Sequence, residues 1–348
     1  MSFLKTVWFW SLLWIISGCD SSSNVIQIEG SKFGTTYRVL VNADQIPPEN
    51  LESLIEERLE LIDISMSTYR IDSEISRFNQ LSKGEKFIVS DDFSRVFNIA
   101  KKVWEVSDKS FNPAIAPLVN LWGFGPDLIN DRIPSHEQIS EILPSTKFSN
   151  ATLITEKGNE LLLKLDEISL DFSGVAKGYA ADVIADLLEL NALPDYLVEI
   201  GGEMRVSGTN AKGAPWRIAI ESPSELKQIE TIISGVNAGI ATSGDYRNYF
   251  EIENQRYSHT LDPRSGYPVK HSLASVTVIA PTCAEADALA TAIMVLGREE
   301  GLRIAAELKL AIFLVSRIDN EYRTEYSNQF EQFLICLLYT SPSPRDDL

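Results

Sequence analysis

LDFSGVAKGYAAD, residues 170–182, joins a predicted strand to a predicted helix. The apolar residues before Ser173 are typical of a strand, small residues form the turn, and a helix follows from about Ala176 to Leu188 before stopping near Pro194. Free backbone N–H groups at the start of a helix, beside Lys177, can bind an anion. The segment is neither a Walker loop nor a G-x-G-x-x-G motif, so a plain loop of small residues fits it as well as a phosphate site does.

Strands and helices on either side of this segment follow one another irregularly. Residues 25–28 and 36–41 are predicted strands joined by a turn-rich connection at residues 30–34, and a helix is predicted from Leu51 to Ile62. Ser90 is a predicted helix cap. A further helix is predicted at residues 284–295, with strands at residues 196–200, 204–207, 216–221, 275–280 and 311–316. Because this order lacks a βαβ repeat, we expect an α+β fold.

The N-terminus has the features of a secretion signal. A positive charge at Lys5 precedes a short apolar run, and Ile16-Ser17-Gly18-Cys19 resembles a bacterial lipobox. We expect residues 1–18 to be removed, Cys19 to be lipidated, and residues 19–24 to form a polar tether to a membrane. An ordinary signal peptide with a chance cysteine is the alternative. Asp20 resembles the signal that keeps lipoproteins at the inner membrane, so we expect the periplasmic side of that membrane.

Composition narrows the classes of protein that the chain can belong to. Acidic residues outnumber basic ones, 49 against 31, so we do not expect a nucleic-acid partner. Only Cys283 and Cys336 remain besides Cys19, too few for an exported fold that depends on disulfides. Residues 25–334 are long enough for one large domain with a sizeable core. Residues 331–334 could close a strand. Residues 335–348 look like translated adapter sequence, and we exclude them, with Cys336, from the natural fold.

Three other stretches carry more polar residues and glycines than a core needs. Residues 66–79 break a helix into a polar loop before a new short helix, which could be no more than a capped connection with an exposed tyrosine. Residues 110–126 interleave aromatic residues with glycines, as in a wall against a flat ring or in a packed surface loop. Residues 199–203 combine a strand with a double glycine, which indicates a bulge or a close backbone approach.

Two further segments contain residue types suited to catalysis. His259 comes just before an Asp-Pro turn, and Asp287 and Thr291 lie one helical turn apart. Residues at this spacing share a helix face, so a carboxylate and a hydroxyl can together hold a hard cation. Spacing alone still favours a solvated helix face for the pair and a hydrogen-bonded structural role for the histidine.

Taken together, these stretches resemble the ApbE family, the FAD:protein FMN transferases. The likeness runs from Gly30 to Phe333, and its motifs follow the family's order. They are Met-Ser-Thr-Tyr followed by Asp-Ser-Glu (66–74), Pro-Leu-Val-Asn-Leu-Trp-Gly-Phe-Gly-Pro (117–126), Ala-Lys-Gly-Tyr-Ala (176–180), Glu-Ile-Gly-Gly-Glu (199–203), His-Thr-Leu-Asp-Pro-Arg-Ser-Gly (259–266) and Ala-Asp-Ala-Leu-Ala-Thr-Ala (286–292). Each motif is weak alone, but the ordered set is specific. The resemblance implies one domain of two mixed α/β lobes with the flavin site between them.

The resemblance also implies roles for individual residues. Contacts with FAD are implied for Phe33, Tyr69, Ser110, Phe111, Asn112, Asp171, Lys177 and Leu261. Tyr69 is expected against the flavin, and Asp171 and Lys177 on the adenine-nucleotide side. Phe33 stands where the family often has methionine, and Asn112 where it usually has aspartate. Magnesium ligands are implied at Gly174, through its carbonyl, and at Asp287 and Thr291. Ala290 stands where some relatives have a further acidic ligand.

The implied reaction is magnesium-assisted transfer of FMN from FAD to a serine or threonine hydroxyl, with release of AMP. His259 is the candidate base for the attacking hydroxyl, and Asp287 is catalytic through the metal. The expected acceptor is a protein with a short Ser/Thr-containing motif, such as a redox-pump subunit. Two alternatives stay open: a magnesium-dependent FAD pyrophosphatase that gives FMN and AMP, and a periplasmic flavin-binding lipoprotein without turnover.

Overall fold

The computed structural model describes residues 25–42, 44, 46–125, 133–223, 228–245, 249–252, 255–319 and 321–335. The predicted signal peptide, Cys19 and the tether lie outside the described residues, as does the tail from residue 336 onward. Ile335, the first residue of the predicted non-native tail, donates a backbone hydrogen bond to the carbonyl of Ile232. Within the described ranges, no helix is both long and apolar enough to cross a bilayer.

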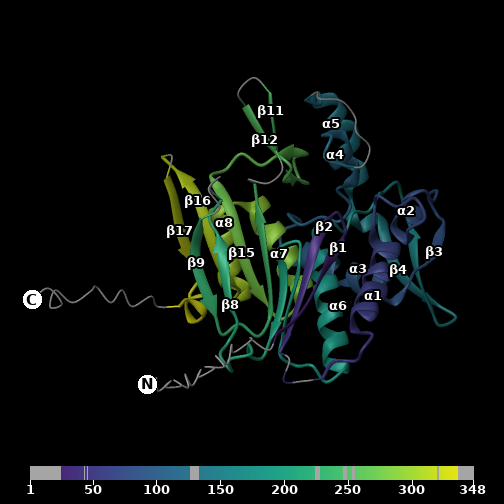
Figure 1. The fold of residues 1–348 in the computed structure, drawn as a ribbon. Coiled ribbons are helices and arrows are strands. Elements are labelled where there is room, and N and C mark those ends of the chain that lie inside the picture. Colours follow the sequence, from purple (N-terminus) through teal and green to yellow (C-terminus); the bar gives the residue numbers. More distant parts are fainter. Residues whose placement is uncertain are drawn as a thin grey trace, which may run out of the picture.

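An eight-stranded sheet runs through the molecule in the order β1-β2-β6-β7-β10-β15-β16-β17 (Figure 1). Its strands are β1 (Val25–Lys32), β2 (Thr35–Asn42), β6 (Tyr196–Ile200), β7 (Glu203–Ser207), β10 (Gly239–Gly244), β15 (Leu273–Ala280), β16 (Ala311–Ile318) and β17 (Glu321–Tyr326). Every neighbouring pair is antiparallel. The antiparallel sheet with separate helices confirms the predicted α+β class.

Helices cover one face of this sheet and enclose the main core. They are α1 (Leu51–Met66), α3 (Asp91–Val106), α6 (Ala176–Leu190), α7 (Cys283–Leu296) and α8 (Arg298–Leu308). Their apolar residues join sheet residues such as Val39, Val198 and Leu314 in one buried cluster. The predicted cap at Ser90 is confirmed, because its hydroxyl accepts the Phe93 N–H at the start of α3.

The opposite face of the sheet carries a second, smaller core. Strands β8 (Arg217–Glu221) and β9 (Ile229–Ser234) pair with each other and pack there around Trp216, Ile218 and Ile233. A 3-10 helix, η3 (Glu331–Phe333), adds Phe333 to this core, and Leu334 bridges Ile233.

Shorter elements surround these two cores. They are α2 (Glu74–Asn79), β3 (Lys86–Ile88), α4 (Ala116–Leu121), α5 (His136–Ile142), η1 (Leu143–Thr146), η2 (Phe148–Asn150), β4 (Ala151–Glu156), β5 (Asn159–Lys164), β11 (Tyr249–Ile252), β12 (Gln255–Ser258), β13 (Leu261–Asp262) and β14 (Tyr267–Pro268). A third small core joins α4, α5 and β13 through Leu118, Ile139 and Leu261.

Three local predictions are wrong. The strand expected just before Ser173 is absent, because residues 165–172 form neither helix nor strand, although Leu170 and Phe172 are buried. The turn-rich connection expected at residues 30–34 is largely strand, because β1 continues to Lys32 and pairs there with Thr35. Only Phe33 and Gly34 turn, and both have a positive φ, 55° and 71°. Residues 331–334, predicted to end a strand, do not form one. Residues 331–333 form the 3-10 helix η3, which packs Phe333 against the second core.

Candidate active site

Helices α6 and α7 approach each other closely at Gly178. A Cβ at this position would lie 2.4 Å from the carbonyl oxygen of Cys283 and 2.8 Å from the Cβ of Asp287, closer than real Cβ atoms come. Asp182, one turn further along α6, accepts the N–H groups of Cys283 and Ala284 at 2.8 Å each and so caps α7. The turn and helix of the 170–182 segment are therefore fixed against the predicted metal-binding helix.

This contact brings the three predicted magnesium ligands together. The N–H of Gly178 donates to Asp287 Oδ2 over 3.1 Å, and the carboxylate is buried. Thr291 Oγ1 would lie 3.1 Å from a Cβ at Gly174, so the turn before α6 touches the same face of α7. Burial raises the pKa of Asp287, against the opposing effect of the Lys177 charge, so a cation near this carboxylate stabilises its ionised form.

The donor set suits a hard cation that keeps part of its hydration shell. It offers one carboxylate, one hydroxyl and one backbone carbonyl, all oxygen atoms. Among the residues that the structure describes, no three His, Cys, Asp or Glu side chains gather as a metal cluster. Phosphate oxygens of a bound ligand and water would therefore have to complete the coordination.

Lys177 lies between two buried carboxylates. Its Nζ donates to Glu203 Oε1 over 3.1 Å and lies 3.9 Å from Asp287 Oδ2. Burial alone would lower the pKa of Lys177, but the charges of Asp287 and Glu203 outweigh this effect and raise it. Burial raises the pKa of Glu203 to about 7. The positive ammonium beside the predicted cation site can attract a ligand phosphate.

The predicted flavin-nucleotide loop at residues 110–112 connects directly to this cluster. Ser110 Oγ donates to the carbonyl of Ala292 on α7 over 3.1 Å, and Phe111 Cε2 would lie 3.3 Å from a Cβ at Gly174. Both polar atoms of Asn112 are used within the fold. Its Nδ2 donates to the Thr146 carbonyl over 2.8 Å, and its Oδ1 accepts the Ala114 N–H over 2.9 Å. These bonds favour a structural role for Asn112.

Asp171 lies at the start of the same turn as Gly174. Its Oδ1 accepts the N–H of Ser173 over 2.7 Å, and its own N–H donates to the carbonyl of Pro113. The side chain thus shapes the turn, while its second carboxylate oxygen has no hydrogen bond within the described part of the chain. That oxygen is the one that a nucleotide could use.

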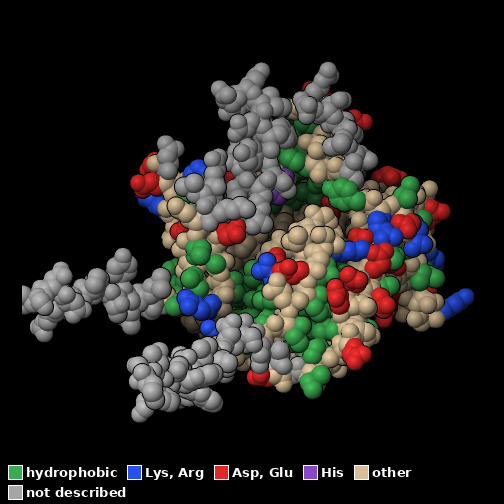
Figure 2. All heavy atoms as spheres, viewed as in Figure 1, with side chains coloured by type: hydrophobic (Ala, Val, Ile, Leu, Met, Phe, Trp, Pro, Cys, Tyr) green, Lys and Arg blue, Asp and Glu red, His purple; other side chains and the backbone are tan. Residues whose placement is uncertain are grey.

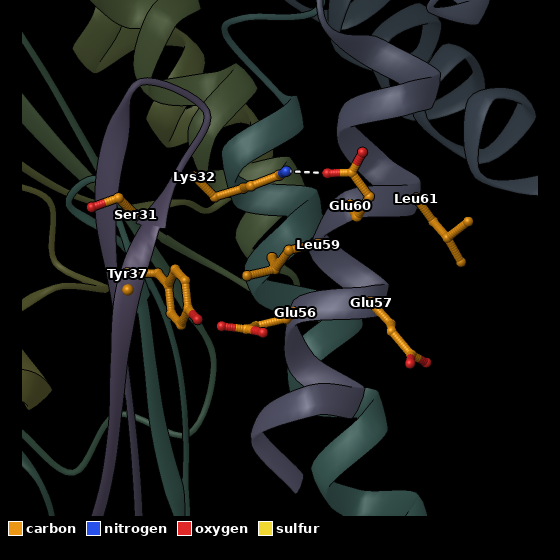
Figure 3. Close-up of a pocket in the computed structure, with 9 residues that line it drawn as sticks. Ser31, Lys32, Tyr37, Glu56, Glu57, Leu59, Glu60 and Leu61 are labelled. Carbon is orange, nitrogen blue, oxygen red and sulfur yellow. Dashed lines mark hydrogen bonds and ion pairs between the residues drawn. The ribbon is translucent and has the colours of Figure 1, made fainter. Parts of the chain in front are cut away.

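The residues next to Tyr69 and Phe33, the predicted flavin neighbours, belong to one network of ion pairs. Tyr69 is 76% exposed, and Phe33 forms the tip of the β1–β2 hairpin. Lys32 pairs with Glu60 on α1 (Figure 3). Arg70 Nη1 lies 2.7 Å from the other oxygen of Glu60, Oε1. The residues next to Phe33 and Tyr69 are therefore held by the same carboxylate.

A hollow of about 670 Å³ lies between this hairpin and α1. It is lined by Lys32, Tyr37, Glu56, Glu57 and Glu60, among others (Figure 3). Burial and the negative charge of Glu56 raise the pKa of Tyr37. Acidic and basic side chains lie intermixed on the surface around α1 (Figure 2). The acidic lining is unsuited to a pyrophosphate, and the hollow does not include Asp287.

The predicted base lies near the third core. The ring of His259 meets that of Phe124 edge-on, with 6.3 Å between centroids and an interplanar angle of 72°. Leu261, two residues further on, is buried with Leu118 and Trp122. Strand β13, which contains Leu261, packs against α7. The segment that carries His259 thus reaches the helix that carries Asp287.

Comparison with known proteins assigns the chain to a family. The model of the ApbE family matches residues 33–314. The chain belongs to the ApbE family. It is 38% identical to the FAD:protein FMN transferase of Vibrio cholerae over 325 residues, which cover 92% of this chain and 96% of the relative. It is 36% identical to the enzyme of that name from Escherichia coli K12 over 329 residues, covering 91% and 94%.

Solved ApbE structures have the same fold. The Vibrio cholerae flavin transferase ApbE superposes with a TM-score of 0.82 at 37% identity. The match covers 90% of this chain and 100% of the solved chain. The apo form of the Pseudomonas stutzeri flavinyl transferase ApbE gives 0.83 at 38% identity, covering 90% and 97%. The predicted family is confirmed. The roles predicted for individual residues remain predictions.

The roles of two acidic residues of this ApbE-family chain, the buried Glu203 and the partly buried Asp182, could not be predicted from the sequence. In the sequence, Glu203 ends a double-glycine motif and Asp182 ends the 170–182 segment, and neither position indicates a bonding partner. Their partners, Lys177 and the start of α7, are distant in the sequence. Each carboxylate lies on a face of otherwise apolar or small residues. This position indicates that it needs a partner, such as an ion pair or the N–H groups at a helix start.

Proposed function

We propose that this chain is an FAD:protein FMN transferase that requires magnesium. An oxygen of a serine or threonine side chain of the acceptor forms a bond with the FMN-side phosphorus, the pyrophosphate P–O bond breaks, and AMP leaves. The hydroxyl proton passes to a base. The observation that carries the proposal is the cluster of Gly174, Lys177, Asp287 and Thr291 at the α6–α7 contact.

Similarity supports the choice of reaction. The Vibrio cholerae and Escherichia coli relatives are FAD:protein FMN transferases and align along almost their whole length. The residues of the cluster lie within the part of the chain that the family model matches. Family membership and the local chemistry therefore favour the same activity.

Each residue of the cluster, and His259 outside it, has a separate task in this proposal. Asp287, Thr291 and the Gly174 carbonyl would hold magnesium, which withdraws charge from the pyrophosphate when bound. Lys177 supplies a fixed positive charge for a phosphate oxygen. His259 takes the proton of the acceptor hydroxyl, a weak nucleophile at neutral pH.

The flavin end of FAD is assigned to the hairpin tip and the loop after α1. Tyr69 presents an exposed ring, which can stack on the isoalloxazine system at low entropic cost. Phe33 and Phe111 add apolar contacts. The Lys32–Glu60–Arg70 network holds the backbone on both sides of the proposed flavin position.

Mass spectrometry tests the proposal directly. The chain without residues 1–24 is incubated with FAD, MgCl₂ and a candidate acceptor that contains a Ser/Thr flavinylation motif, and the intact acceptor is weighed. We expect the acceptor to gain one FMN, and no gain with the Asp287→Ala variant. Free FMN with an unmodified acceptor would favour the pyrophosphatase alternative, and FAD retained intact with magnesium present would favour a binding protein.

We further propose that the mature protein is anchored through lipidated Cys19 on the periplasmic side of the inner membrane, where it modifies a subunit of a redox pump. The lipobox-like sequence and Asp20 support this location. Fractionation of cells that express the parent and the Cys19→Ser variant tests it. A Cys19→Ser protein that is processed at the signal and still sediments with membranes would exclude the lipid anchor.

A further inference from the structure

Glu203 contacts Lys177 of the site cluster, and neither the family resemblance nor the proposed reaction assigns it a task. It begins β7, directly after the tight turn at Gly201 and Gly202, whose φ angles are 66° and 107°. Its side chain is 7% exposed. Oε1 accepts the Lys177 ammonium, whereas Oε2 is buried without a hydrogen-bond partner among the residues that the structure describes. A buried carboxylate with an unpaired oxygen is costly to the fold, which points to a functional reason for keeping it.

The position of Lys177 depends on this carboxylate. The ammonium donates a hydrogen bond to Glu203 over 3.1 Å, whereas its contact with Asp287 Oδ2, at 3.9 Å, is an ion pair without a hydrogen bond. The stem is also confined, because a Cβ at Gly201 would lie 3.3 Å from Lys177 Cδ. Asp287 meanwhile receives its direct hydrogen bond from the Gly178 backbone. Glu203 therefore holds the ammonium at ion-pair distance from Asp287, short of a direct hydrogen bond.

We propose that Glu203 is a positioning residue that keeps the Lys177 ammonium from donating a direct hydrogen bond to Asp287 and so leaves the Asp287 oxygen atoms available to a divalent cation. Without the negative charge on residue 203, Asp287 is the remaining anionic partner for a buried ammonium. The lysine then competes with the cation for one carboxylate. The proposal rests on the cation site of the proposed function and adds a residue outside the implied ligand set.

Divalent-cation affinity, measured without any transfer reaction, tests the proposal. Mn²⁺ is titrated into the chain lacking residues 1–24, with and without FAD, and free Mn²⁺ is counted by electron paramagnetic resonance. Replacing a residue that supports a metal ligand typically weakens metal binding about 10–100-fold. We expect a loss in this range for Glu203→Gln.

Glu199→Gln is the matched control. Glu199 belongs to the same turn, and its Oε1 accepts the Gly202 N–H over 2.7 Å, but it makes no ion pair with Lys177 in the described structure. We expect this variant to bind Mn²⁺ like the parent. An equal loss in both variants would mean that distortion of the turn, and not the position of the lysine, causes the effect, and the proposal would be wrong.

Repeating the Glu203 substitution in a Lys177→Met variant distinguishes positioning of the lysine by Glu203 from direct coordination of the cation by Glu203. In Lys177→Met the competing ammonium is absent, so adding Glu203→Gln should cause no further loss of Mn²⁺ affinity. The same loss in both backgrounds, or no loss in either, would overturn the proposal. If Glu203→Gln does not fold, as judged by circular dichroism, the pair Glu203→Asp and Glu203→Asp/Lys177→Met is used. The shorter carboxylate should then give a smaller loss that also vanishes in the methionine background.

Failure of the proposed function gives a different result. A parent chain that binds Mn²⁺ and shows the Glu203 effect but transfers no FMN would refute the transferase and leave the positioning role intact. A parent chain that binds no Mn²⁺ with or without FAD would refute the cation site and the role of Glu203 together.

Discussion

Replacing Gly178 by alanine tests whether the close contact of α6 and α7 builds the site. The added Cβ would lie 2.4 Å from the Cys283 carbonyl oxygen, 2.7 Å from its carbon and 2.8 Å from the Cβ of Asp287. Backbone atoms of α7 cannot move aside like the end of a flexible side chain, so the two helices must separate. The separation also lengthens the bond from the Gly178 N–H to Asp287.

The change in the free energy of unfolding for Gly178→Ala follows from two opposing effects. Alanine is favoured over glycine inside a helix by about 1 kcal/mol. Forcing an extra carbon into a tightly packed interior costs about 1–3 kcal/mol. Because the added carbon here would clash with backbone atoms, we expect a cost near the upper end of that range. We therefore expect Gly178→Ala to lower the free energy of unfolding by about 1–2 kcal/mol, the difference between these two effects.

Urea unfolding followed by circular dichroism measures this change. Gly301→Ala in α8 is the matched control, because its Cβ would meet a single side-chain atom, Ile293 Cγ2 at 2.6 Å, and no backbone within 3 Å. We expect a smaller loss there, and unchanged Mn²⁺ affinity, whereas Gly178→Ala should weaken Mn²⁺ binding as well. A Gly178→Ala protein as stable as the parent, with full metal affinity, would refute the argument that this contact sets the geometry.

Three further predictions concern binding and turnover. Tyr69→Ala should weaken FAD binding, measured by fluorescence titration, by about 1–3 kcal/mol through loss of an aromatic contact, and unchanged affinity would remove Tyr69 from the flavin site. His259→Ala should slow single-turnover transfer on the order of a hundredfold and leave FAD affinity unchanged, and parental rates would exclude it as the base. Asp287→Ala should abolish transfer, whereas Thr291→Ala should only weaken it and recover partly at raised MgCl₂, since Asp287 supplies the only negative charge among the implied ligands. Activity of Asp287→Ala in the presence of a chelator would contradict the metal site.

Local sequence patterns were enough to predict the principal helices and many strands. The apolar spacing from Leu51 to Ile62 and the cap at Ser90 depend on neighbours within a turn or two, and both are found in the structure. The α+β class followed from the order of these elements. The end of β1 cannot be predicted from the glycines at residues 30–34, which locally favour a turn, because pairing with β2 keeps the chain extended to Lys32.

Contacts between distant segments could not be derived from local patterns. The pairing of β2 with β6 joins residues more than a hundred positions apart, and no periodicity encodes it. The same limit applies to the site. The shared helix face makes Asp287 and Thr291 no more than candidate cation ligands, and their role is implied by the family resemblance. The link from Lys177 to Glu203 depends on how the sheet places β7 beside α6. For Asn112, the bonds to Thr146 and Ala114 indicate a structural role that the sequence alone did not suggest.

The stoichiometry of the products tests the transferase proposal most directly. FAD is mixed with the chain, MgCl₂ and an acceptor with a Ser/Thr motif, and AMP, free FMN and acceptor-bound FMN are counted in the same sample over time. We predict that AMP and acceptor-bound FMN appear in equal amounts and that free FMN stays at the background of a reaction without protein. AMP accompanied by an equal amount of free FMN, with an unmodified acceptor, would contradict the proposal.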